Sequence, residues 1–199
     1  MLLNIVLGFI FLSAHSDTTY VVNYREELQV LMQNGAPAKI PLNEELQLML
    51  GKDSVLLSEV LKPPYIWNVN FEFNSKGEYS FTKNSTHPMI RGTGTKFYYR
   101  DGKYYTSENS SGQKPLELKV EKENGTKEIL GYNCQKFIAK DSNDKVIYEI
   151  YATDQLPGFI TAEFRFPSFG LAILEIRKAD GSWMRTATEF YLKTKPLEE

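Results

Sequence analysis

A chain of 199 residues is long enough for one domain with a substantial core and too short for two. Its formal net charge of -2 gives no basic surface for nucleic acid, and its single cysteine excludes an internal disulfide framework. The 12 tyrosines and 12 phenylalanines favour strands over helices.

The chain begins with an apolar run, residues 1–11, which is followed by the small residues Ala14 and Ser16. This order is typical of a secretory signal peptide and its cleavage site, although no lysine or arginine precedes the run. The run is too short for a membrane span, which needs about 20 apolar residues. A buried first strand is the alternative. We predict a signal peptide over residues 1–16 and a single β-rich domain over residues 17–199, periplasmic or secreted and without a transmembrane anchor.

The first part of the mature chain alternates in the manner of strands. Residues 18–24 have strand period, whereas the pattern of residues 26–33 allows either strand or a short helix. Two apolar runs, 44–50 and 54–60, flank a Gly-Lys-Asp turn and predict a hairpin. Residues 65–75 are rich in aromatic side chains and predict a strand or an irregular loop over the core.

An Asp-Gly pair at 101–102 joins two aromatic runs and is the strongest hairpin signal in the chain. A polar loop is expected over residues 109–114, and Asn124-Gly125 is expected to turn one strand back into the next. The fold class that results is mainly β: a single strongly curved antiparallel sheet or half-barrel with about ten strands and little helix. The remaining predicted strands cover residues 78–83, 96–100, 103–107, 116–121 and 126–130, then 134–139 paired with 146–151 and 171–177 paired with 183–193.

No group of residues indicates catalysis. Beyond the predicted signal peptide the chain has one histidine, His87, and one cysteine, Cys134, which lies in a strand-like run typical of a buried structural thiol. One histidine and one cysteine do not make a closed transition-metal site. The Asp-rich turn at residues 141–144 lacks the glycine and glutamate of a calcium loop. We expect no enzyme activity, metal or cofactor; an enzyme that uses His87 or this turn is the less favoured hypothesis.

Aromatic residues are the candidates for binding. Across the Asp-Gly hairpin, Tyr98 and Tyr99 are expected to face Tyr105 and Tyr104, which either stabilises the sheet or presents an aromatic surface. The phenylalanines exceed what short strands need, so they either fill the core or line a cavity for a lipid-like ligand. The candidate ligand-binding residues are Tyr98, Tyr105, Phe71, Phe73, Phe164, Phe166 and Phe169.

Residues 127–136, KEILGYNCQK, resemble the K-x-I-L-G-Y-x-C-x-K segment of the GLPGLI family of envelope proteins. Residues 151–157 and 169–175 stand for the W-Y-T-x-x-I-P and G-L-P-G-L-I-L-E segments of that family, although Ala172 and its neighbours replace the Pro-Gly. The resemblance implies a secreted or periplasmic protein. Its strand-rich layout is also similar to the lipoprotein-carrier half-barrels, which is an analogy of fold alone. The family-motif positions are Leu130, Gly131, Tyr132, Cys134, Pro157, Gly170 and Leu171.

These patterns predict an exported, non-enzymatic envelope protein that binds a hydrophobic or lipid-like ligand in a concave sheet. The alternative is an envelope protein–protein interaction or scaffold module that docks through a sheet face or edge. The direction of the aromatic side chains distinguishes the two, because a carrier points them into a cavity and a docking module onto an exposed surface.

Overall fold

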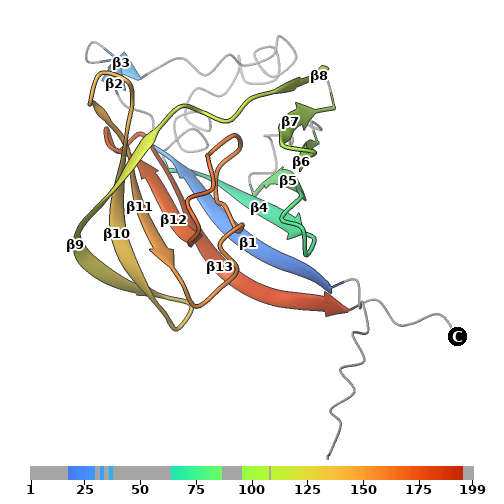
Figure 1. The fold of residues 1–199 in the computed structure, drawn as a ribbon. Coiled ribbons are helices and arrows are strands. Elements are labelled where there is room, and N and C mark those ends of the chain that lie inside the picture. Colours follow the sequence, from blue (N-terminus) through green and yellow to red (C-terminus); the bar gives the residue numbers. More distant parts are fainter. Residues whose placement is uncertain are drawn as a thin grey trace, which may run out of the picture.

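The computed structural model describes residues 18–29, 32–33, 36–37, 64–86, 96–107 and 109–194 (Figure 1). Eleven strands of this part form one antiparallel sheet in the order β8-β7-β6-β5-β4-β1-β13-β12-β11-β10-β9, and β2 pairs separately with β3. The part of the chain that is described contains no helix, and hence none able to cross a bilayer. The strands are β1 (Thr18–Leu28), β2 (Met32–Gln33), β3 (Ala36–Pro37), β4 (Tyr65–Phe73), β5 (Tyr79–Ser85), β6 (Phe97–Arg100), β7 (Lys103–Thr106), β8 (Asn109–Gln113), β9 (Lys119–Ile129), β10 (Tyr132–Lys140), β11 (Val146–Thr153), β12 (Ala172–Lys178) and β13 (Trp183–Thr194).

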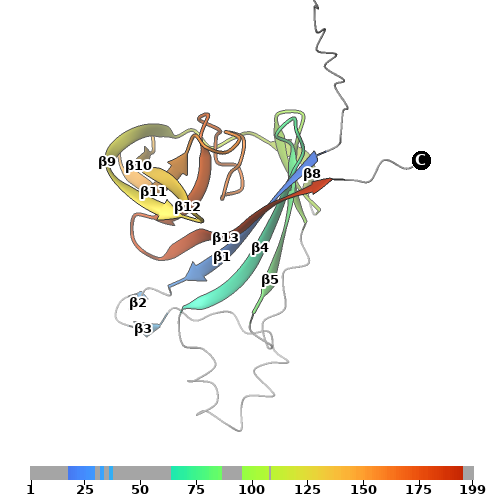
Figure 2. The same ribbon diagram turned by 90° about the horizontal axis from the view of Figure 1, so that it is seen from below.

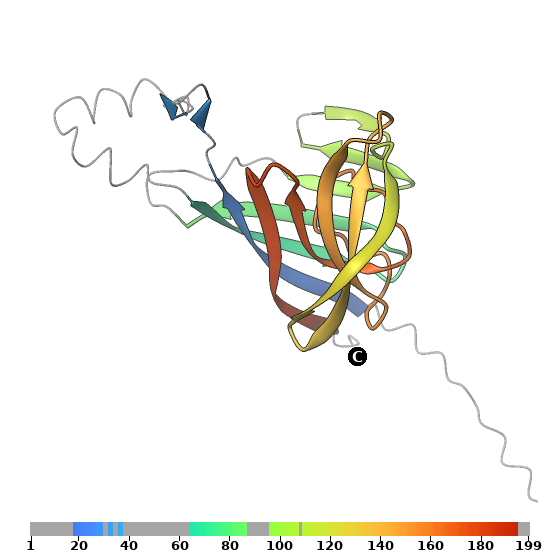
Figure 3. The same cartoon turned by 90° about the vertical axis from the view of Figure 1, so that its left-hand side faces the viewer.

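The predicted curved antiparallel sheet is confirmed. The long strands β13, β1, β4 and β5 form one band, and β9 to β12 curl away from it (Figures 2 and 3). The pairing of β12 with β13 covers only Glu175–Arg177, whereas β1 pairs with β13 along its whole length. The sheet therefore bends between β12 and β13, which places one half opposite the other.

In two of the hairpins, a two-residue turn joins the two strands. Asp101 and Gly102, between β6 and β7, have φ angles of 51° and 73°. Leu130 and Gly131, between β9 and β10, have φ angles of 54° and 81°. Both pairs lie in the left-handed region that a type I′ turn needs, and this turn matches the twist of the strands it joins. The Asp-Gly hairpin is thus confirmed.

The turn expected at Asn124-Gly125 is wrong. Strand β9 continues through both residues, and the ladder shifts register opposite Gln135 and Phe137 of β10. Gly125 has a φ of 132°, and the Gln135 side chain donates hydrogen bonds to the carbonyl oxygens of Glu123 (2.6 Å) and Gly125 (2.8 Å). The Asn-Gly pair therefore forms a β-bulge, in which a side-chain amide replaces the missing ladder bonds.

Two further local predictions are corrected. A helix was one alternative for residues 26–33, but residues 26–28 belong to strand β1. This strand pairs with β4 on one side and with β13 on the other. The expected loop at 109–114 is largely strand β8, which pairs with β7. In both places pairing with a neighbouring strand overrides weak local preference. The predicted signal peptide, the hairpin of 44–50 with 54–60, and His87 lie outside the described residues.

Residues 154–171, the connector between β11 and β12, cover the inner face of the sheet, which carries Tyr24, Phe71 and Phe81. The connector lies between the two halves in Figures 1 and 2. Its two ends touch through their backbones: a Cβ on Gly158 would lie 2.3 Å from the carbonyl oxygen of Gly170. Glycine is required at 158 because a methyl group there has no space.

Candidate functional site

The structure separates the predicted ligand-binding aromatics into two groups. Phe71, Phe73 and Phe166 are buried in the core, and Phe164 and Phe169 pack against it. Tyr98 and Tyr105 lie on the opposite, outer face of the sheet, since they share a cross-strand row with Ser80 and Glu72. The prediction that the tyrosines face each other across the hairpin is confirmed. Whether any of these seven residues binds a ligand stays a prediction.

The connector fills the inner side with its own rings. Phe164 lies 5.1 Å from Phe97 and 5.5 Å from Tyr104 between ring centroids, and Phe159 lies 5.4 Å from Tyr20. The Tyr104 hydroxyl donates a hydrogen bond to the Phe166 carbonyl oxygen at 3.2 Å, and burial raises the pKa of Tyr104 to about 12. The phenol therefore stays a donor at neutral pH, and it fastens the connector to the first half of the sheet.

An ionic cluster of Glu26, Lys83, Glu163 and Arg185 lies beneath the connector. Arg185 donates from Nε to Glu26 Oε2 at 3.1 Å, and its Nη2 makes a second, shorter bond to the same oxygen. Lys83 pairs with the other oxygen of Glu26, while Nη1 of Arg185 bonds the Ala162 carbonyl oxygen and lies 3.6 Å from Glu163. Glu26 is 2% and Arg185 4% exposed, so each charge is stabilised by the other and not by water.

The pKa values of the two carboxylates in this cluster, Glu26 and Glu163, are shifted in opposite directions. Burial alone would raise the pKa of Glu26, but the charges and hydrogen bonds of Arg185 and Lys83 hold it below its usual value. Burial raises the pKa of Glu163, which Arg185 only partly offsets and the Glu26 charge reinforces. Nε, Nη1 and Nη2 of Arg185 all bond groups of the fold itself. We therefore interpret the cluster as structural: it anchors the connector to β1, β5 and β13.

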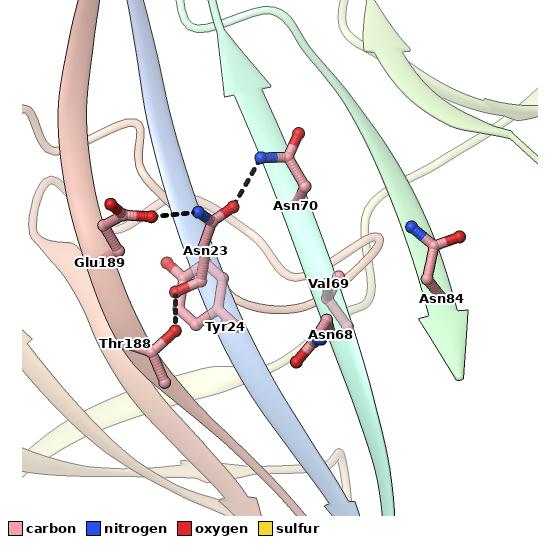
Figure 4. Close-up of a pocket in the computed structure, with 8 residues that line it drawn as sticks. All are labelled: Asn23, Tyr24, Asn68, Val69, Asn70, Asn84, Thr188 and Glu189. Carbon is pink, nitrogen blue, oxygen red and sulfur yellow. Dashed lines mark hydrogen bonds between the residues drawn. The ribbon is translucent and has the colours of Figure 1, made fainter. Parts of the chain in front are cut away.

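The outer face contains an open polar groove of about 450 Å³ over β13, β1, β4 and β5 (Figure 4). Asn70 donates to Asn23 Oδ1 at 2.6 Å, and Asn23 donates to Glu189 Oε2 at 2.5 Å. Asn68 and Asn84 face each other on β4 and β5, and neither side chain has a partner among the described residues. The residues that line the groove are Asn23, Tyr24, Asn68, Val69, Asn70, Asn84, Thr188 and Glu189.

The tyrosine pair lies on the same face as this groove. Tyr98 and Tyr105 stack with ring centroids 5.4 Å apart and an interplanar angle of 10°, and both side chains are half-exposed. Ser80, the cross-strand partner of Tyr98, stands two residues from Thr82, which pairs with Asn70 of the groove. Successive residues on one face of a strand are about 7 Å apart, so the tyrosine row and the asparagine row are neighbours.

The groove was not predicted from the sequence. The signal was present in β4, where Asn68 and Asn70 alternate with Val69 and Phe71. Asparagine is depleted in strands, so two of them on one face of a strand indicate a role outside the core. Asn23 and Asn84 lie beside these two residues because β1 and β5 pair with β4. The sequence does not specify this pairing.

The family-motif residues occupy structural positions. Leu130 and Gly131 form the β9–β10 turn, and Tyr132 packs edge-on against Phe190 at 6.4 Å. Pro157 and Gly170 lie at the two ends of the connector, and the half-buried Leu171 follows.

Cys134 is fully buried, as expected for a structural thiol. Burial raises its pKa to about 11, and the charge of Glu175 adds to that effect. The thiol is therefore protonated at neutral pH and a poor nucleophile. Within the described ranges, no three His, Cys, Asp or Glu side chains are placed to hold a metal ion.

Comparison with known proteins gives little. No family model and no curated protein matches the chain. Two structures of PNGF-II, in the P21 and C2 space groups, are similar at a TM-score of 0.37 and 14% identity. Each similarity covers 92% of this chain but only 29% or 28% of the PNGF-II chain. The chain thus spans less than a third of that protein, and a likeness at this level carries no argument about function.

Proposed function

We propose that the protein is an exported, non-enzymatic binding or scaffold module of the bacterial envelope that docks a partner on the outer face of its sheet. One observation carries this proposal. The inner face is covered by the connector, whereas the outer face has an open groove and a half-exposed tyrosine pair. Two side chains of the groove, Asn68 and Asn84, have no partner among the residues that the structure describes. The envelope location rests on the predicted signal peptide and on the resemblance to the GLPGLI family.

The groove suits recognition better than catalysis. Its polar lining residues are four amides, the hydroxyls of Thr188 and Tyr24, and one carboxylate. The Tyr24 hydroxyl donates to the Ile173 carbonyl oxygen, and the carboxylate accepts a hydrogen bond from Asn23. A general acid or base needs a titrating group free to exchange a proton with substrate. Amides do not titrate, but they donate and accept hydrogen bonds at the same time, which is the requirement for recognising a partner.

Docking on the outer face is tested by removing two amides of the groove together, in Asn68→Ala/Asn84→Ala. The full chain is sedimented with isolated envelopes over a range of concentrations. We expect saturable binding that the double variant weakens about tenfold, because two polar contacts are lost. Thermal unfolding should stay unchanged, since both side chains are exposed.

The matched control is Asn133→Ala/Asn143→Ala, which removes two exposed asparagines elsewhere on the fold, on β10 and in the β10–β11 turn. This control should bind like the original protein. Equal binding by the groove variant, or the absence of any saturable binding, would contradict docking on this face.

A carrier of an apolar ligand is the second candidate. The connector inserts Phe159 and Phe164 among the rings of the inner face, in the place that an apolar ligand would take. Displacement of the connector would expose that space. Native mass spectrometry of protein purified from the envelope should then show a co-purifying lipid that is released on unfolding. A ligand-free mass, with no uptake when phospholipid is titrated in, would remove this candidate.

A further inference from the structure

We propose that the outer face binds a neutral saccharide chain, which lies across the strands from the groove to the stacked tyrosines. This inference rests on the proposed function, because it names the chemistry of the partner that docks there. The binding surface consists of the groove residues Asn23, Asn68, Asn70 and Asn84 together with the Tyr98–Tyr105 pair.

The amides of the groove fit sugar hydroxyls. A hydroxyl both donates and accepts a hydrogen bond, and an asparagine amide offers one acceptor oxygen and two donor protons at a fixed spacing. Asn68 and Asn84 have both ends of the amide free within the described part of the chain. Asn70 donates from its amide nitrogen to Asn23. This bond orients the Asn70 amide, and its oxygen remains available as an acceptor.

The groove is also held in place before any ligand arrives. Glu189 fixes Asn23, Asn23 fixes Asn70, and Thr188 donates to the Asn23 carbonyl oxygen at 3.1 Å. All of these side chains stand on strands in the middle of the sheet. Polar groups that are already ordered lose little conformational entropy on binding, which matters for a ligand that contributes only hydrogen bonds and ring contacts.

The tyrosine pair supplies the apolar contact that a sugar also needs. A pyranose ring has an apolar C–H face, and an aromatic side chain combines an apolar ring with a polar tip. Tyr98 and Tyr105 are half-exposed, and stacking on one another limits their rotation. Pairs like this are ordinary sheet stabilisers on their own. Here they share a face with Asn68 and Asn84, whose amides have no partner in the described part of the chain, and this combination points to a saccharide.

The charges disfavour other ligand classes. The groove lining contains no lysine or arginine, and its single charge is the carboxylate of Glu189. A phosphate or an acidic peptide would meet the like charge of Glu189 there, and like charges repel. The cation beside Asn68, Arg25 of β1, is already paired with Glu27 at 2.8 Å. The surface is long rather than deep: β13 and β7 are five strand spacings apart, or about 24 Å. A chain of several sugar units fits this length better than a single small molecule.

The test is native electrophoresis of the full chain in gels that contain hydroxyethylcellulose, a soluble neutral polysaccharide, followed by calorimetric titration with cellohexaose and chitohexaose. We expect retardation of the original protein, and an affinity roughly tenfold lower for Asn68→Ala/Asn84→Ala and for Tyr98→Ala. Tyr98→Phe keeps the ring and should bind within about twofold of the original protein. Added sodium chloride should change little, since no ion pair forms.

The outcomes separate this inference from the proposed function. Retardation that Asn68→Ala/Asn84→Ala and Tyr98→Ala both weaken, and that the Asn133→Ala/Asn143→Ala control retains, supports saccharide binding. If no neutral saccharide binds while envelope sedimentation still depends on Asn68 and Asn84, the ligand is a protein or another component and the saccharide inference is overturned. If neither assay depends on these residues, docking on the outer face fails as well.

Discussion

Replacing Arg185 with alanine lowers the free energy of unfolding by about 3–5 kcal/mol, because it leaves the buried carboxylate of Glu26 without its main partner. The variant also loses the donor to the Ala162 carbonyl oxygen, and with it one anchor of the connector. Urea unfolding of the two proteins at neutral pH measures the difference.

The loss should depend on pH. The folded pKa of Glu26 is lowered, so its stabilising effect is present above the unfolded value, about 4.3, and disappears as the pH falls through the folded value. Without Arg185, burial favours the neutral carboxyl, and the difference between the two proteins shrinks in acid. The double variant Glu26→Leu/Arg185→Met removes both charges and should be more stable than Arg185→Ala alone. If Arg185→Ala proves as stable as the original chain, the cluster is not an anchor.

Replacing Phe166 with alanine should cost about 3–5 kcal/mol of unfolding free energy, since it empties a buried site of the core. The ring lies 5.9 Å from Tyr148 of β11, and the backbone beside it accepts the Tyr104 hydrogen bond. The loss therefore falls at the point where the connector touches both halves of the sheet. Urea unfolding again gives the value.

Phe169→Ala is the matched control, because Phe169 belongs to the same connector but is only half-buried, 5.3 Å from Phe137. It should cost clearly less, since less apolar surface returns to water on truncation. Equal losses in the two variants would mean that the connector acts as one unit, in which no single ring is decisive.

Sequence reasoning succeeds here where the cause is local. The Asp-Gly pair specifies its hairpin and thereby the facing of Tyr98 and Tyr105, because a two-residue turn allows one register. The same reasoning fails at Asn124-Gly125. A bulge and a turn both call for glycine, and only the Gln135 side chain on the next strand decides between them.

The candidate sites were beyond sequence reasoning for a different reason. Glu26 and Arg185 are joined across 159 positions of the chain, and Asn23 and Glu189 across 166. Each of these residues reads as an exposed polar position in an alternating strand. Alternation shows which side chains of one strand lie on the same face, but not which other strand will pair with it.

The pairing of β1 with β13 also determines when the fold can form. These strands are the two described ends of the chain, and they lie next to each other in the interior of the sheet. Contacts between distant positions form slowly, since a long loop must close before they contribute. During synthesis, β1 has no partner on that side until residues 183–194 have left the ribosome. The sheet thus stays incomplete until β13 has been made, and a nascent chain that stops short of β13 lacks the strand that joins its two halves.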